Sequence, residues 1–160
     1  MTRVNAHHAM SHGYETDTVT RLETNLDDCT GETLGAAMEA LLAAGALDVW
    51  FMPIQMKKHR PGVQLSVLSE PDRADTLVEL IFKSTSAFGL RRETITRVKL
   101  SRQFRTLETE YGAITVKLGL KGDEIVQVAP EYESCRAAAD RHHVTVSEAF
   151  QAALRAYRPG

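Results

Sequence analysis

The sequence predicts an α+β protein whose first half, residues 18–102, is a ferredoxin-like unit of strand, helix, strand, strand, helix, strand. Runs with alternating apolar residues indicate the strands, and apolar residues at helical spacing indicate the two helices between them. Pro53 lies inside the second strand, and proline suits an edge strand, which is where this topology places it. Residues 103–160 predict a smaller unit of a β-hairpin, a third strand and two helices, which we expect to pack against the first.

The first strand and helix follow directly from the pattern. Residues 18–26 alternate between one face with Thr20, Leu22, Thr24 and Leu26 and another with Arg21, Glu23 and Asn25. Residues 32–44 repeat apolar side chains every three or four positions, and Gly45 supplies the expected helix end. A strand delivering acidic residues to a helix start is therefore predicted.

The rest of the first unit contains three strands and one helix. Strands are predicted at residues 47–56, 63–68 and 91–100, with a polar loop at 57–62 and a small-residue loop at 84–89. The second helix opens at Pro71, and its buried stripe consists of Ala74, Leu77, Val78, Ile81 and Phe82.

The second unit is predicted from shorter signals. Strands are expected at residues 104–110, 113–120 and 124–129, and helices at 130–141 and 146–157. Thr145 and Glu148 have the spacing of a capping box at the start of the last helix.

Composition excludes several classes of protein. The net charge of -2 is too small to attract nucleic acid or a membrane surface by bulk electrostatics, and no apolar run is long enough to cross a bilayer. Cys29 and Cys135 lie far apart with no C-x-x-C pair, so we expect free thiols in the cytoplasm. Residues 1–17 are predicted to be a disordered leader, whose His7, His8 and His12 suit adventitious metal binding better than an organised metal site.

Chain direction brings three chemically rich loops to one edge of the predicted sheet. We call these loops the loop rim: L-D-D-C-T-G at residues 26–31, K-K-H-R-P-G at 57–62 and S-T-S-A-F-G-L-R at 84–91. Each begins where a strand or helix finishes running toward the same end of the sheet. The loops are therefore expected to lie together.

The loop rim has the groups that bind a metal–nucleoside triphosphate. Adjacent carboxylates at Asp27 and Asp28 suit a hard divalent ion shared with phosphate oxygens. Cations and loop amides suit the phosphates themselves, at Lys57, Lys58, Arg60, Gly62, Gly89 and Arg91. Two structural alternatives stay open: a salt-bridged solvated surface, and helix capping by Asp28 or Thr30. The sequence contains neither a Walker motif nor G-x-G-x-x-G.

Four blocks, in order, resemble the C-terminal domain of the lactate racemase nickel-insertion protein family: E-T-N-L-D-D-C-T-G-E, G-A-L-D-V-W-F-M-P-I-Q-M-K-K-H-R-P-G-V, F-G-L-R and A-P-E-Y-E-S-C. The resemblance covers about residues 18–157 and implies a nickel chelatase, or cyclometallase. Such an enzyme inserts Ni²⁺ into pyridinium-3,5-bisthiocarboxylic acid mononucleotide, consumes CTP and uses Mn²⁺ or Mg²⁺. The C-terminal domain would bind CTP and form homo-oligomers.

The resemblance implies roles for individual residues. Asp27 and Asp28 would hold the divalent ion, and with Lys58 and Arg60 they would form the catalytic set. The nucleotide would contact Asn25, Lys57, Lys58, Arg60, Gly62, Gly89, Arg91 and Tyr132. Tyr132 or Glu133 would recognise the nucleobase or accept a proton as a general base. For Glu131 and Glu133, the alternative is a role at the start of a helix. Cys29 would shuttle metal or simply pack in the interior.

The resemblance also implies partners. An N-terminal domain of the full-length family protein and a small-molecule cofactor precursor would act with this chain, which alone is expected to bind nucleotide without completing nickel insertion. A non-catalytic nucleotide-sensing or oligomerisation module is the alternative. RNA binding is set aside because the outer face of the first and third strands, with Arg21, Glu23, Gln64 and Ser66, offers no aromatic ring for stacking.

Overall fold

The computed structural model describes residues 13–158, and most of the predicted leader, with its three histidines, lies outside the described residues. The chain divides into two compact units. The ferredoxin-like unit is Asp17–Arg97, and the C-terminal unit consists of residues 98–158 together with residues 13–16. The division falls five residues before the predicted one, and the packing of one unit against the other stays a prediction.

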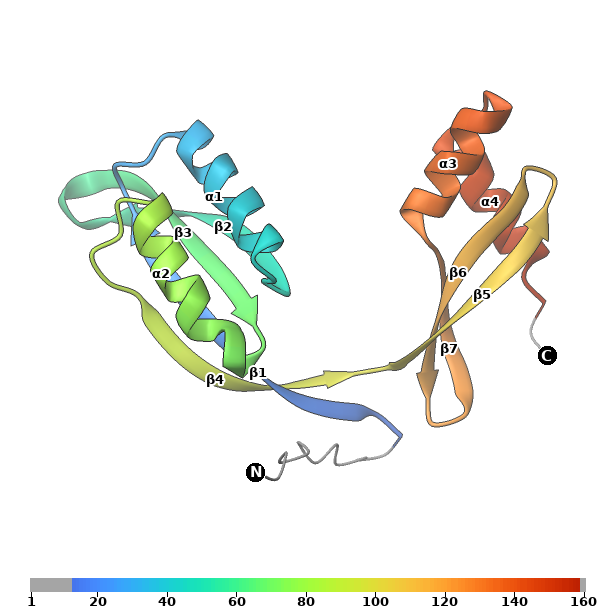
Figure 1. The fold of residues 1–160 in the computed structure, drawn as a ribbon, viewed down its shortest axis with the longest axis horizontal. Coiled ribbons are helices and arrows are strands. Elements are labelled where there is room, and N and C mark those ends of the chain that lie inside the picture. The colour runs from blue at the N-terminus through green and yellow to red at the C-terminus, as the bar shows by residue number, and fades with distance from the viewer. Residues whose placement is uncertain (1–12, 159–160) are drawn as a thin grey trace. The chain divides into compact units, whose positions relative to one another are not determined.

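The ferredoxin-like arrangement is confirmed (Figure 1). Its elements follow the predicted order: β1 (Glu15–Leu26), α1 (Gly31–Ala43), β2 (Asp48–Met56), β3 (Arg60–Ser69), α2 (Ala74–Ser84) and β4 (Arg91–Lys99). The sheet order is β2-β3-β1-β4, and β3 runs antiparallel to both β1 and β2. Pro53 therefore lies in an edge strand, as expected.

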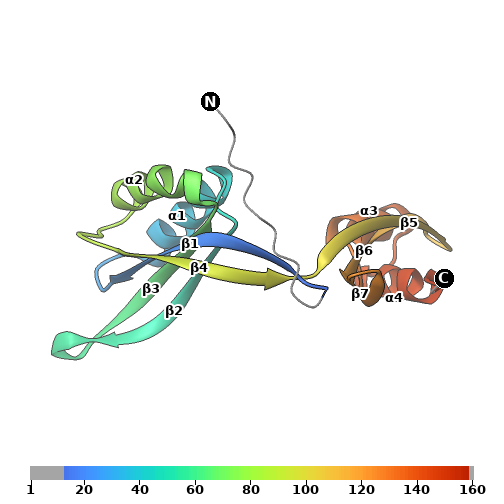
Figure 2. The same ribbon diagram turned by 90° about the horizontal axis from the view of Figure 1, so that it is seen from below.

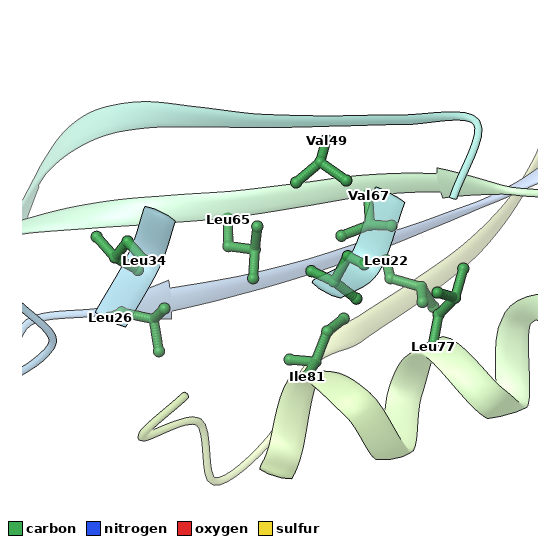
Figure 3. Close-up of a cluster of buried hydrophobic side chains, with 9 residues drawn as sticks. Leu22, Leu26, Leu34, Val49, Leu65, Val67, Leu77 and Ile81 are labelled. Carbon is green, nitrogen blue, oxygen red and sulfur yellow. The ribbon is translucent and has the colours of Figure 1, made fainter. Parts of the chain in front are cut away.

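Both helices of this unit cover one face of the sheet, as Figure 2 shows. Leu22 and Leu26 of β1 and Leu65 of β3 are buried there against side chains of α1 and α2 (Figure 3). The remaining members of this core are Leu34, Leu41, Val49, Val67, Leu77 and Ile81. The period-two pattern of the strands thus becomes one covered face, which holds the loop rim in place at the end of the sheet.

Two boundaries in this unit differ from the predictions. β1 begins at Glu15 rather than residue 18, and the Asp17 carboxylate there pairs with Arg97 of β4 at 2.7 Å. The hairpin loop between β2 and β3 is only the short helix Lys57–His59, because Met56 already pairs with Arg60. Residues 60–62 are therefore strand rather than loop.

The C-terminal unit is a three-stranded antiparallel sheet with two helices. Its elements are β5 (Ser101–Thr109), β6 (Gly112–Lys121), β7 (Glu124–Pro130), α3 (Tyr132–His142) and α4 (Val146–Ala156). The first helix begins at Tyr132 rather than residue 130, because Pro130 still pairs with Val116 of β6. Cys135 is fully buried in this core, and burial raises the pKa of its thiol.

Within residues 13–158, none of the helices has the length and apolar character that crossing a bilayer demands.

The predicted capping box at the start of α4 is present. The Thr145 hydroxyl accepts from the Glu148 N–H at 3.2 Å, and the Glu148 carboxylate accepts from the Thr145 N–H at 2.8 Å. The hydrogen bonds that Thr145 donates from its backbone and its hydroxyl lower the pKa of Glu148.

Thr145→Ala is expected to lower the free energy of unfolding by about 1 kcal/mol at pH 7, since it removes the cap. A carboxyl with a lowered pKa stabilises the fold above its ordinary pKa of 4.5 and loses that effect as the pH falls. The difference between variant and parent should therefore shrink below pH 4.5 in urea titrations. Ser147→Ala is the control, because Ser147 lies two residues after Thr145 and is exposed. An equal loss of stability in that variant would contradict the capping role of Thr145.

Candidate functional site

The three loops of the loop rim lie together at one end of the sheet (Figure 1). β1 ends at Leu26, which pairs with Val63, so Asp27 reaches Arg60 on β3 at 3.2 Å. From the other side of β1, the Ser86 hydroxyl donates to the Asp28 carboxylate. Two neighbouring acids therefore connect the β2–β3 hairpin and the α2–β4 loop, as the predicted topology requires.

The α2–β4 loop is tied to β1 by further contacts. The Thr24 hydroxyl donates to the Gly89 carbonyl at 2.8 Å, and Cys29 Sγ lies 3.0 Å from the Ser86 hydroxyl. Cys29 is half-buried and packs against the hydrophobic core. The packing alternative for Cys29 therefore has direct structural support, and its thiol also helps to position the loop.

Arg91 joins the rim to the uncovered face of the sheet. Its guanidinium donates to the Asn25 amide oxygen at 2.8 Å and lies 3.6 Å from the Glu23 carboxylate. Beside it, Glu93 and Glu23 raise the pKa of Arg21. This face is a network of charged and amide groups along β1 and β4, so two of the predicted nucleotide contacts, Asn25 and Arg91, already contact each other.

Asp27 and Asp28 have different partners. Asp27 pairs with Arg60, whereas Asp28 accepts from Ser86 on a separate loop. No group of three His, Cys, Asp or Glu side chains able to hold a metal occurs in the part of the chain that the structure describes. Two carboxylates fit a divalent ion only if phosphate oxygens and water complete its coordination, which is the usual arrangement for Mg²⁺.

The helix-capping alternative applies to Thr30 and not to Asp28. Thr30 is the N-cap of α1, and its hydroxyl accepts from the Thr33 N–H at 3.2 Å. Asp28 instead accepts from Ser86. Its carboxylate thus takes no part in capping the start of α1 and belongs to the loop rim.

Lys57 and Lys58 lie at the tip of the hairpin. β3 extends three residues beyond its pairing with Leu26, so the tip projects past the end of β1, as Figure 2 shows. Lys58 and His59 have positive φ angles of 60° and 57°, which ordinary residues adopt at a cost of about 1 kcal/mol or more. Among residues 13–158, neither lysine has an ion-pair partner. The hairpin therefore presents uncompensated positive charge next to the Asp27–Arg60 pair.

A shallow cavity of about 190 Å³ adjoins Asp27 and the start of β3. Its walls are Leu26, Asp27, Cys29, Pro61, Gly62 and Val63. The space is large enough for one phosphate group and too small for a whole nucleotide, since sites for drug-sized ligands measure roughly 300–1,000 Å³. A nucleotide would therefore extend from this cavity over the exposed rim.

The two rim glycines differ in what surrounds them. A Cβ at Gly62 would lie 2.8 Å from the Leu26 carbonyl oxygen and 2.7 Å from the Met56 sulfur, whereas a Cβ at Gly89 would meet nothing within 4 Å. Gly62 thus allows β3 to approach β1 closely where Asp27 and Arg60 meet.

Gly62→Ala is expected to lower the free energy of unfolding by about 1–3 kcal/mol, because a backbone atom must move. Gly89→Ala should change it by less than about 1 kcal/mol. Urea titrations of both variants test this contrast, and equal losses would show that the close approach at Gly62 is unimportant.

Tyr132 belongs to the C-terminal unit, where it is the first residue of α3 and is largely exposed. Its contact with a nucleotide on the rim stays a prediction. Glu131 pairs with Lys117 at 3.0 Å, and Glu133 lies 3.6 Å from Arg136. Glu131 occupies the N-cap position of α3, but its side chain makes no capping hydrogen bond. Its carboxylate forms the ion pair with Lys117 of β6 instead.

Sequence reasoning missed three side chains that the structure brings into the site. Ser86 bonds Asp28, Thr24 anchors Gly89, and Glu23 faces Arg91. The small-residue loop was recognised as part of the rim, but which of its hydroxyls would meet an acid depends on how the loop folds back over β1. No local pattern gives that information.

Comparisons with known proteins show which family the chain resembles. A family model described as nickel insertion protein matches residues 1–150. A putative nickel insertion protein of Syntrophotalea carbinolica is 45% identical over 139 residues, covering 87% of this chain and 35% of the relative. The pyridinium-3,5-bisthiocarboxylic acid mononucleotide nickel insertion protein of Lactiplantibacillus plantarum is 44% identical over 138 residues, covering 86% and 33%.

The fold also has a solved counterpart. The C-terminal domain of a cyclometallase involved in the synthesis of the NPN cofactor of lactate racemase, in apo form, superposes with a TM-score of 0.84 at 43% identity. The match covers 88% of this chain and 97% of that domain. This chain spans about a third of the length of the curated relatives that it matches. By the extent of these matches, the chain belongs to the nickel insertion protein family.

Proposed function

We propose that this chain binds CTP together with Mn²⁺ or Mg²⁺ at its loop rim and acts as the nucleotide-binding part of a nickel chelatase. The chelatase inserts Ni²⁺ into pyridinium-3,5-bisthiocarboxylic acid mononucleotide, the compound named in the description of the Lactiplantibacillus plantarum relative. The observation that carries the proposal is the meeting of Asp27 and Asp28 with Arg60 and the Ser86 loop at one edge.

The cations of the hairpin would neutralise the triphosphate. Lys57 and Lys58 have exposed ammonium groups without partners among the described residues, and Arg60 offers a fork suited to phosphate oxygens. Arg60 already holds a carboxylate, so a phosphate arriving there would release Asp27. This exchange would supply an acid for the divalent ion at the moment the nucleotide binds.

The divalent ion would be held by Asp27, Asp28 and phosphate oxygens, and it would supply positive charge against the triphosphate. Asp28 would give up its bond from Ser86, whose hydroxyl could then donate to a phosphate. Arg91, Asn25 and the amides near Gly89 would border the rest of the nucleotide. Tyr132, exposed at the start of α3, is the proposed contact for the cytosine base.

Nickel itself would be bound mainly by the substrate. Thiocarboxylate sulfur is a soft donor that suits nickel better than the oxygen groups of this rim. The N-terminal part of the relatives would therefore act with this chain, and the assembled cytoplasmic protein would form homo-oligomers. In support, the similar solved domain is the C-terminal domain of a cyclometallase.

Calorimetry with CTP in the presence and absence of Mn²⁺ tests the binding proposal. We expect a dissociation constant in the micromolar range that weakens at least about tenfold without the metal. Folded protein that binds no CTP under either condition would refute it. UTP is the matched control, because it carries the same triphosphate on a different pyrimidine.

A second candidate is a nucleotide-sensing module that binds CTP without chemistry. The separate partners of Asp27 and Asp28 favour it, because each carboxylate is already engaged by another side chain. Phosphate release distinguishes the candidates, measured with the full-length family protein carrying this domain, Ni²⁺ and the pincer precursor. Release that depends on the precursor supports the chelatase; CTP binding without release supports the sensor.

A further inference from the structure

The C-terminal unit contains a cationic pocket that no part of the proposed CTP site uses. It has a volume of about 210 Å³ and is lined by Leu100, Arg102, Lys117, Gly119, Gln127 and Ala129. All of these residues belong to the C-terminal unit, so the pocket is complete within one compact body.

Strand register places the pocket on the face of the sheet that the helices leave uncovered. Arg102 pairs with Gly119 and Phe104 pairs with Lys117, and directly paired residues point to the same face. The alternate residues of β6, Ile114, Val116 and Leu118, are buried against α3 and α4. Gln127 and Ala129 of β7 complete the uncovered face, since they pair with Gly119 and Lys117.

Gly119 lies in the lining of the pocket, and the Leu100 side chain packs over it. A Cβ on Gly119 would lie 2.7 Å from the Leu100 side chain and 3.3 Å from Gln127. Glycine is therefore the residue that lets Leu100 and Gln127 approach across the sheet. Ala129 adds a small side chain to the lining of the hollow, which also includes the two cations Arg102 and Lys117.

The charged side chains that line the pocket, Arg102 and Lys117, give it a net positive charge. The Arg102 side chain is exposed and has no hydrogen bond or ion pair with any residue from 13 to 158. The Lys117 ammonium, 41% exposed, pairs with Glu131 at 3.0 Å, so this lysine is partly neutralised. Gln127 provides an amide donor. A guanidinium, an ammonium and an amide around a small hollow match an oxyanion.

An aromatic ring lies beside these groups. Phe104 is 61% exposed, lies directly across from Lys117 and is two residues from Arg102 on the same face. Exposed rings of this kind stack on flat ligands. An oxyanion in the pocket would have this ring beside it, and an attached aromatic group could lie over the ring.

We propose that this pocket binds the oxyanion of a small aromatic molecule, with Arg102 and Lys117 holding the anion and Phe104 stacking on the ring. The ligand class that fits is a pyridinium mononucleotide, which carries a phosphate, a ring carboxylate or thiocarboxylate and a flat ring. This choice of ligand rests on the proposed function, whereas the anion site rests on the pocket alone. The C-terminal unit is thus a docking place for the cofactor precursor, separate from the CTP site.

Nicotinic acid mononucleotide is the probe, titrated into the full chain by calorimetry. Arg102→Gln and Phe104→Ala are each expected to weaken binding about tenfold or more. Arg105→Gln is the matched control: Arg105 is on the same strand but pairs with Val116, so it faces the opposite side of the sheet. Competition by inorganic phosphate identifies the phosphate as the anchored group, and competition by nicotinate identifies the carboxylate; either supports the site.

Unchanged affinity in Arg102→Gln, or an equal loss in Arg105→Gln, overturns the inference. CTP with Mn²⁺, titrated into the same variants, separates the two proposals. Normal CTP binding by protein that fails to bind the mononucleotide refutes only the cationic pocket. Arg102-dependent mononucleotide binding without any CTP binding refutes only the proposed rim function.

Discussion

Lys57→Glu should weaken binding of CTP with Mn²⁺ at least about 100-fold, a change equivalent to about 2.7 kcal/mol. The substitution replaces an unpaired positive charge at the hairpin tip with a negative one beside a triphosphate. Because Lys57 is exposed and outside the core, the fold should be unchanged. Calorimetry measures the affinity, and circular dichroism checks that the variant is folded.

Arg73→Glu is the matched control for this charge reversal. Arg73 is exposed and precedes α2, while the rim loop follows the other end of that helix, Ser84. The 11-residue helix α2 places Arg73 about 16 Å from the rim loop. At that distance, salt screens much of the interaction between a charge at position 73 and a ligand on the rim. If Lys57→Glu retains its affinity for CTP, or if Arg73→Glu loses as much affinity as Lys57→Glu, the nucleotide does not bind at the loop rim.

Leu22→Ala should lower the free energy of unfolding of the ferredoxin-like unit by about 2–5 kcal/mol. Leu22 is fully buried at the centre of the helix-covered face, between β3 and α2 (Figure 3). Truncation removes apolar contacts and leaves a cavity that the surrounding strands cannot fill. Trp50 is the single tryptophan of the chain and lies in β2, so its fluorescence reports unfolding of this unit in urea.

Leu42→Ala provides the comparison, because Leu42 lies on α1 and is 47% exposed. It should cost less than about 1 kcal/mol. A loss below 1 kcal/mol at Leu22, or a loss at Leu42 as large as that at Leu22, would contradict the assignment of the core.

The arrangement of the first unit was predictable because its signals are local. The succession of strands and helices implies which strands are central, and Pro53 in the second strand agrees with its place at the edge. Once the order is fixed, chain direction alone places the acidic, basic and small-residue loops at one end. The meeting of Asp27 with Arg60 follows from topology rather than from any motif.

The finer geometry could not be predicted, because it depends on contacts between distant residues. The two residues Lys58 and His59 turn the hairpin with positive φ, a backbone conformation usually marked by glycine or asparagine. The different partners of Asp27 and Asp28 depend on where Ser86 falls after α2. The pocket near Gly119 depends on strand register in the second sheet, which alternation alone leaves undetermined.

Paramagnetic broadening by Mn²⁺ tests the central claim most directly, since it locates the metal–nucleotide complex on the protein. Amide resonances of the labelled chain are recorded with CTP while Mn²⁺ is added in small amounts. The resonances of residues 25–31, 57–62 and 86–91 should broaden first, because these loops meet around Asp27. Broadening confined to other segments, with these three loops unaffected, would contradict a metal–CTP site on the loop rim.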